Sequence, residues 1–282
     1  MVKQSVTVAT RQPPPREFWA NELEFDSARA EQAVAAYEAM EEWIDGLTGQ
    51  RVRMLCVLLG LEHEGSVRKL RPLLYERAEE LRPFFLVEQF GKGKSEVAVV
   101  EVAREALPPH LVDLCIRRKR KRREAADGDE PADERYDKTA LLFGLYAKDP
   151  NLLKEAFHFD KVHKKGFASM VLAEAAKIPP KTSFGAFLTE ETVRGIVEAY
   201  QRTRRDGSES ELQGIWMREG RYYVFIRRTE RPGHIRVRGQ GIVHGDLTEW
   251  IVLDFSPDGD QINIASRSVE AVSYTHLTLP TN

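Results

Sequence analysis

The spacing of apolar residues changes near Gly207, and this change limits the folds open to the chain. Across most of the sequence before Gly207, apolar residues recur at spacings of three and four, as Val34, Tyr37 and Met40 do, which predicts amphipathic helices. After Gly207, short β-prone stretches alternate with turn residues, which predicts strands. Short turns favour antiparallel neighbours, because parallel strands need long crossovers. We therefore expect an α+β protein with a helical N-terminal domain and a C-terminal meander of about five antiparallel strands.

Each expected element has its own stretch of sequence. The expected helices cover residues 27–47, 50–61, 67–71, 72–82, 110–116, 137–147, 151–158, 161–177 and 190–204. The expected strands of the C-terminal part cover residues 213–219, 221–228, 234–239, 247–255 and 261–266. Thr189 stands where a helix cap is needed, directly before the last of these helices.

A densely charged segment lies in the middle of the chain. Its first part is a run of seven successive cations: Arg117, Arg118, Lys119, Arg120, Lys121, Arg122 and Arg123. Acidic residues set among Ala, Gly and Pro follow directly, and such a stretch buries too little apolar area to fold. We expect residues 124–135 to link a domain at residues 16–123 to a second domain at residues 136–272, after a flexible lead-in at residues 1–15.

The first domain contains two further β-prone stretches, residues 84–90 and 95–103, which are joined by Gly91-Lys92-Gly93-Lys94. Helices followed by a β-hairpin are the element order of a winged helix-turn-helix, which this region resembles in topology. That resemblance places Lys92 and Lys94 at the hairpin tip, where they would contact phosphates. The preceding helix carries several glutamates, which would repel DNA, so a protein-binding winged helix is the alternative.

The basic run is the first candidate for function. Seven successive cations favour a polyanion as partner, and nucleic-acid phosphate is the obvious one. The alternative is local neutralisation, because the acidic residues that follow carry nearly equal and opposite charge.

The strands of the C-terminal part supply a second set of candidates. Alternation places Arg221, Tyr223, Phe225 and Arg227 on one face of a strand, and the next strand adds Arg236 and Arg238. Aromatic rings interleaved with guanidinium groups stack bases and hold the backbone of a single nucleic-acid strand. The alternative is a half-buried sheet whose aromatic side chains belong to the core and whose arginines reach out to solvent.

The sequence contains no common catalytic, nucleotide-binding or zinc-binding signature. The best group of metal-ligating residues is His158, Asp160 and His163, but a spacing of five places the two histidines on different faces of a helix. We therefore expect neither a metal nor a cofactor, and no enzymatic activity from these residues alone.

Cys56 and Cys115 lie in apolar helical stretches, so we expect buried free thiols in a reducing compartment. The start of the chain lacks the pattern of a secretory signal, and the apolar runs are too short to span a bilayer. These features predict a cytoplasmic protein that is not bound to a membrane.

The last residues, 273–282, contain no Asp, Glu, Lys or Arg, unlike the rest of the chain. They resemble a translated sequencing-adapter tail, such as is found in reading frames from fragmentary metagenomic assemblies. The alternative is a natural disordered terminus. The first interpretation implies that the natural protein continues past Val272.

These features together favour a non-enzymatic, nucleic-acid-associated regulatory or accessory protein that binds DNA or RNA through the winged-helix-like domain and the basic segments. A protein-protein interaction or scaffold module is the alternative, in which the basic run is part of a linker. A fragment of a larger enzyme is the third hypothesis.

Overall fold

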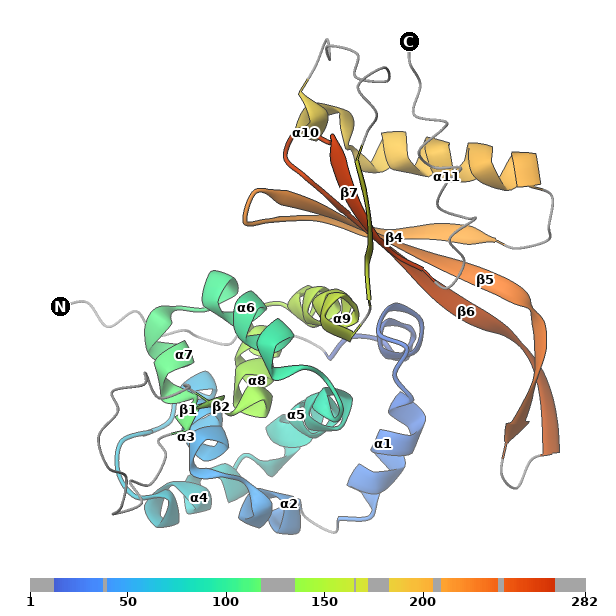
Figure 1. Ribbon diagram of the computed structural model, residues 1–282. Helices are drawn as coiled ribbons and strands as arrows, with labels where there is room; N and C mark the ends of the chain where they lie inside the picture. Colours follow the sequence, from blue (N-terminus) through green and yellow to red (C-terminus); the bar gives the residue numbers. More distant parts are fainter. Residues whose placement is uncertain are drawn as a thin grey trace, which may run out of the picture. The chain divides into compact units, whose positions relative to one another are not determined.

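The computed structural model describes residues 13–37, 40–117, 135–164, 166–171, 183–204, 209–237 and 241–266. For residues 204, 230–237 and 241–247 it describes the backbone alone. The chain divides into two compact units, Met1–His163 and Lys164–Asn282, which we call the helical unit and the sheet unit. The predicted α+β class is confirmed, because helices form the N-terminal part and a five-stranded antiparallel sheet lies in the C-terminal part (Figure 1).

The helical unit consists of helices and one short ladder. Its elements are η1 (Phe18–Glu22), α1 (Ser27–Ala35), α2 (Glu41–Gly46), α3 (Gly49–Leu58), α4 (Val67–Tyr75), α5 (Ala78–Gly91), α6 (Glu96–Ala106), α7 (Pro109–Leu114), β1 (Ile116–Arg117), β2 (Arg135–Tyr136), α8 (Lys138–Lys148) and α9 (Asn151–Lys164). Side chains at the N-cap positions accept hydrogen bonds from the first turn of several of these helices. Asp26 accepts a hydrogen bond from the Arg29 N–H at 3.1 Å, and Thr48 accepts one from the Arg51 N–H at 3.4 Å.

Helix α8 forms the centre of the helical unit. It is apolar on every side, and Leu141, Leu142 and Phe143 are completely buried. It packs against α3, α5 and α6. The residues after the predicted linker 124–135 therefore belong to the first unit, and the boundary between units falls after His163 instead.

The predicted β-hairpin in the first domain is wrong. Residues 84–90 lie in α5 and residues 95–103 begin α6, with Ser95 as the N-cap. The β-branched residues of this stretch favour strands locally, but Ala98, Val99 and Val102 form a helical stripe that is buried in the core. Tertiary packing therefore overrides local strand propensity, and the winged-helix topology does not form.

The sheet unit contains one sheet and two helices. Its elements are β3 (Ala168–Val171), α10 (Phe184–Phe187), α11 (Glu190–Arg204), β4 (Ser210–Arg218), β5 (Arg221–Val237), β6 (Gly241–Phe255) and β7 (Gln261–Ala265). The strand order is β3-β7-β6-β5-β4, and neighbouring strands are antiparallel. Val193 and Val197 of α11 are buried in one core with residues of the sheet, among them Val224, Ile226 and Leu253.

The predicted number of strands is right, but their membership differs. The stretch 221–228 and residues 234–237 of the next predicted strand belong to the single strand β5, because a register shift between Thr229 and Pro232 accommodates the proline. Residues 238–239 of that predicted strand lie outside the described residues. The fifth strand is β3, which lies inside the helix predicted at residues 161–177. Its register with β7 runs from Ala168 opposite Ile264 to Val171 opposite Gln261.

Both cysteines are free and buried, as the sequence predicts. Burial raises the pKa of the Cys56 thiol to about 11 and, together with the nearby Asp137 carboxylate, that of Cys115 to about 12. Both thiols are therefore protonated and unreactive at neutral pH. Within the described ranges, no helix has both the length and the apolar character needed to span a lipid bilayer.

Because α8 belongs to the helical unit, a cavity in α8 should destabilise the helices that pack against it and not the sheet. Leu142→Ala removes a completely buried side chain and should lower the free energy of unfolding by about 2–5 kcal/mol. Amide hydrogen exchange should rise in α3, α5 and α6 and stay unchanged in β4, β5 and β6. An increase confined to the sheet would contradict the assignment.

Candidate functional site

The basic run starts from a short antiparallel ladder of the helical unit. Ile116 of β1 lies opposite Tyr136 of β2, and Arg117 lies opposite Arg135. Residues 118–134, which hold the rest of the basic run and nearly all of the acidic stretch, lie outside the described residues. Because the ladder joins the two ends of this segment, the segment is an excursion from the helical unit and does not connect two domains. We call the paired residues 116–117 and 135–136 the stem.

Asp137 lies directly after the stem and is completely buried. Its carboxylate caps α8 by accepting hydrogen bonds from the Thr139 and Ala140 N–H groups at 3.2 and 3.3 Å. It also accepts a bond of 2.8 Å from the Thr48 hydroxyl, at the start of α3. The Asp137 N–H in turn donates to the Cys115 carbonyl at 2.8 Å. One residue therefore connects the stem to α3 and to α8.

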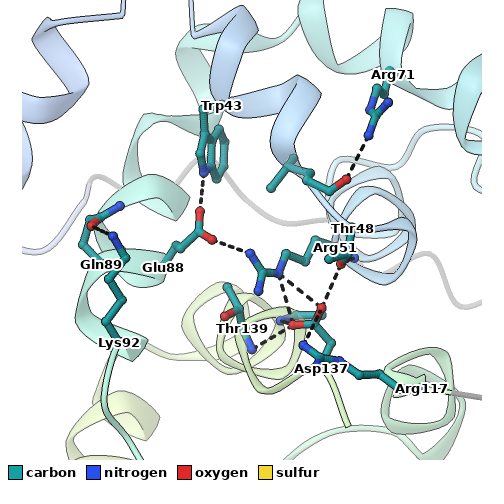
Figure 2. Close-up of polar contacts among 12 residues, drawn as sticks. Trp43, Thr48, Arg51, Arg71, Glu88, Gln89, Lys92, Arg117, Asp137 and Thr139 are labelled. Atoms are coloured by element: carbon teal, nitrogen blue, oxygen red, sulfur yellow. Dashed lines mark hydrogen bonds and ion pairs between the residues drawn. The ribbon is translucent and has the colours of Figure 1, made fainter. Parts of the chain in front are cut away.

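Two arginines balance the Asp137 carboxylate (Figure 2). The Arg51 Nε lies 3.1 and 3.2 Å from the two carboxylate oxygens, and an Arg117 terminal nitrogen lies 3.4 Å from one of them. Arg51 also donates to Glu88, which accepts a further hydrogen bond from the Trp43 indole. The Arg51 and Glu88 side chains are only 18% and 16% exposed. The group holds two acids and two arginines, so its charges cancel.

Opposing effects set the protonation of Asp137. Burial alone would raise the pKa of its carboxyl group. The positive charge of Arg51 and the hydrogen bonds from Thr48, Arg51 and the Ala140 N–H outweigh burial, so the pKa lies below its usual value of 3.8. Asp137 is therefore ionised at neutral pH, and it holds part of the charge of Arg117.

The structure places Lys92 and Lys94 in the turn between α5 and α6, not at a hairpin tip. The Lys92 ammonium donates to the Gln89 side chain. The Lys94 ammonium lies over two aromatic rings, 4.8 Å from the Phe90 centroid and 4.9 Å from that of Phe157. Lys94 is therefore part of the packing of the helical unit, and the reason for predicting a phosphate contact at these lysines is gone.

The predicted alternation on β5 is confirmed, but the predicted stacking surface is not. Arg221, Tyr223, Phe225 and Arg227 share the face opposite the buried residues Val224 and Ile226 that pack with α11. Phe225 is completely buried, so it is wrong as a base-stacking residue. Its burial matches the alternative interpretation, in which the aromatic side chains belong to the core.

The two arginines of this face are paired with acids. Arg221 donates to Asp254 at 2.6 Å, and Arg227 donates to Glu211 at 2.9 Å. Their charge is thus partly balanced within the sheet unit. Of the other two predicted contacts, Arg236 lies in β5 opposite Ile242, whereas the remaining one, Arg238, falls outside the described residues.

A groove of about 640 Å³ lies in the sheet unit beside α11 and the start of β4. Its cations are Arg194 and Arg227, and its acids are Glu198, Glu209 and Glu211. The acids outnumber the cations, so the groove is unsuited to a polyanion. The Gln201 side chain, also in the groove, donates to the Ser210 carbonyl and occupies a backbone acceptor of β4.

The histidines noted in α9 do not come together as a metal site. His158 is completely buried; burial, with the charges of Lys154 and Lys161, lowers its pKa to about 3, so it is neutral at pH 7. The Asp160 carboxylate accepts a 2.6 Å bond from the Ser95 N–H, and the His163 ring lies 3.0 Å from the Glu101 carboxylate. Among the side chains that the structure describes, no three His, Cys, Asp or Glu residues converge as metal ligands.

Sequence reasoning missed the Asp137 group. Thr48 and Arg51 lie far from Asp137 in the chain, and no motif joins them. The available signal was local: Asp137 stands directly before an apolar helix, where a cap is expected.

A scan against protein-family models, a search of curated proteins and a search of solved structures each find no match to this chain.

The charge balance at Asp137 predicts a pH-dependent loss of stability. Asp137→Asn should lower the free energy of unfolding at pH 7 by about 3 kcal/mol, because Arg51 loses its buried partner. The folded-state pKa lies below the unfolded value of 3.8, so the wild-type advantage is present above pH 3.8 and is lost as the pH falls through the folded-state pKa. Denaturant unfolding between pH 7 and pH 2 measures the difference. Asp113→Asn, at an exposed position, is the matched control. If the difference in free energy of unfolding between the wild type and Asp137→Asn does not change with pH, this account is contradicted.

Proposed function

We propose that the protein binds nucleic acid through the basic run at residues 117–123, in a regulatory or accessory role that requires no catalysis. The observation that carries the proposal is the origin of this run. The first of the seven successive cations, Arg117, lies in an antiparallel stem that Asp137 ties to α3 and α8, and the other six follow it directly in the sequence. A polyanion such as DNA or RNA is the partner whose charge matches such a run.

The stem supports the proposal because its contacts fasten it to the helical unit. Tyr136 is buried, and its N–H donates to the Glu96 carboxylate at 2.8 Å, so β2 is also fastened to α6. The first cation of the run therefore starts from an ordered position. Binding is opposed by the conformational entropy that a bound segment loses, and a segment whose ends are held together by a ladder has less of this entropy to lose.

The residues after Arg117 would contribute most of the binding to nucleic acid. Arg117 shares its charge with Asp137, so residues 118–123 carry most of the charge available to a partner. The acidic stretch that follows competes for the same cations. In the sheet unit, Arg221 and Arg227 are paired with acids, and acids outnumber cations in the groove beside α11. These features give little support to a second nucleic-acid site, so the proposal rests on the helical unit.

Replacing the cations at residues 118–123 with glutamine should weaken binding to duplex and single-stranded nucleic acid at least about tenfold at low salt. Arg117 stays in place to keep its pairing with Asp137. Fluorescence anisotropy of labelled oligonucleotides measures the affinity. A charge-matched control variant replaces six exposed cations elsewhere: Arg29, Arg68, Lys69, Lys164, Arg194 and Arg202.

The control variant should bind nearly as well as the wild type. Equal losses in both variants would mean that net charge alone governs binding. If the wild-type protein binds neither nucleic-acid form at about 50 mM salt, where phosphate contacts are strong, the proposed function fails.

The acidic stretch has a measurable effect of its own under this proposal. Neutralising Glu124, Asp127, Asp129, Glu130, Asp133 and Glu134 as Gln or Asn should raise the affinity for nucleic acid, because it removes the internal competitor. The same oligonucleotide titration measures the change. A lower affinity in this variant would show that the acids contribute to binding and do not oppose it.

A further inference from the structure

Strand β4 forms one edge of the sheet, because the strand order ends at β4 and its neighbour is β5 (Figure 1). The two strands are joined by a two-residue turn, Glu219-Gly220, in which both residues have positive φ. The closing pair of such a turn is hydrogen-bonded, and bonded pairs then alternate along an antiparallel ladder. Ile215 and Met217 fall between the bonded pairs, so their backbone N–H and C=O groups are directed away from β5.

This edge of β4 is open. Met217 is 68% exposed, and no described strand pairs with β4 on the side away from β5. The Gln201 side chain donates to the carbonyl of Ser210, the first residue of the strand. Natural sheets protect their edges with devices such as proline or lysine, and residues 214–217 include neither. An extended segment of another chain can therefore pair with β4 as a further strand.

The groove beside the start of β4 adds a charge preference. Its two cations, Arg194 and Arg227, each form an ion pair with an acid of the sheet unit. Among the described residues, Glu198 and Glu209 of the groove form no ion pair, and both are exposed. Two carboxylates in this groove thus remain for the cations of a partner.

The two faces of β4 differ, which defines the sequence that fits along it. Ile215 packs against the core that α11 shares with the sheet, and Met217 shares its face. Glu211 lies opposite Arg227 on the other face, and Glu209, two residues before it, shares that face. A segment paired along β4 therefore places alternate residues near apolar side chains and near acids.

We propose that β4 and the groove bind an extended segment of a partner protein in which apolar and basic residues alternate. Main-chain hydrogen bonds along residues 214–217 would supply affinity, and the acids would select the basic residues. The protein's own basic run, residues 117–123, does not fit this pattern because it contains no apolar residue. The site lies in the sheet unit and does not depend on the proposed binding of nucleic acid.

Fluorescence anisotropy of labelled peptides with the full chain tests the site. One peptide alternates lysine and valine over eight residues, a second has glutamate in place of lysine, and a third is the first with methyl groups on its backbone amides. The lysine peptide should bind, and the glutamate peptide should bind at least about tenfold more weakly because it meets free carboxylates. The methylated peptide should also bind at least about tenfold more weakly, because it has no amide donors for β4.

Variants of the protein test the contribution of the groove. Glu198→Gln combined with Glu209→Gln should weaken binding of the lysine peptide about threefold or more. The matched control combines Glu62→Gln with Glu64→Gln, which removes two exposed acids of the helical unit and should leave the affinity unchanged. Equal losses in the two double variants would mean that net charge alone attracts the peptide, which would overturn the proposed role of the groove.

Hydrogen exchange locates the bound peptide on the strand. The Ile215 and Met217 amides should exchange more slowly when the lysine peptide is bound, because they then donate to it. The proposal is wrong if these amides are unaffected, or if the lysine peptide binds no better than its methylated form.

Two further results would replace the proposed partner by another occupant of the edge. If glutamine at residues 118–123 raises the affinity for the lysine peptide, the protein's own basic run competes for the site. If sedimentation detects a dimer of the chain that the lysine peptide dissociates, a second copy occupies the edge. Either result would contradict the assignment to a partner protein.

Discussion

The Asp137 carboxylate keeps its charge in the interior of the helical unit because Arg51 lies beside it. A buried carboxylate without a partner is strongly unfavourable, so the Asp137 carboxylate depends on this ion pair and on the hydrogen bonds around it. The group joins the start of α3 to the start of α8 and to the stem. This buried charge therefore helps to fix where the charged segment begins and ends on the helical unit.

The stem and helix α8 together explain why the charged segment does not separate two domains. A segment too polar to fold is expected to be a linker when nothing holds its ends together. Here the backbone pairs Arg117 with Arg135, and α8 follows immediately as the centre of the first unit. The polar composition of residues 118–134 is compatible with either arrangement, and the apolar sequence of α8 decides between them.

Features set by neighbouring residues were predictable from the sequence. Helix α11 spans Glu190–Arg204 as expected, and the Thr189 hydroxyl accepts a hydrogen bond from the Thr192 N–H at 3.2 Å. The alternation along β5 also follows from strand geometry alone. These predictions succeeded because a cap and a strand period depend on a few adjacent positions.

Features set by distant residues were not predictable in this way. The valines of α6 favour a strand locally, but burial in the core of the helical unit makes them helical. Strand β3 forms because β7, far along the chain, offers an edge to pair with. The partners of Asp137 likewise depend on how the chain folds.

The central functional claim is that positive charge of the basic run is available to a polyanion and is not neutralised by the acidic stretch. The dependence of nucleic-acid affinity on salt measures this most directly, because each neutralised phosphate of a duplex contributes about −0.9 to the slope of log K against log salt concentration. With residues 118–123 engaged, we expect a slope steeper than about −3 for the wild type. A slope shallower than about −1, equivalent to a single phosphate contact, would contradict the account.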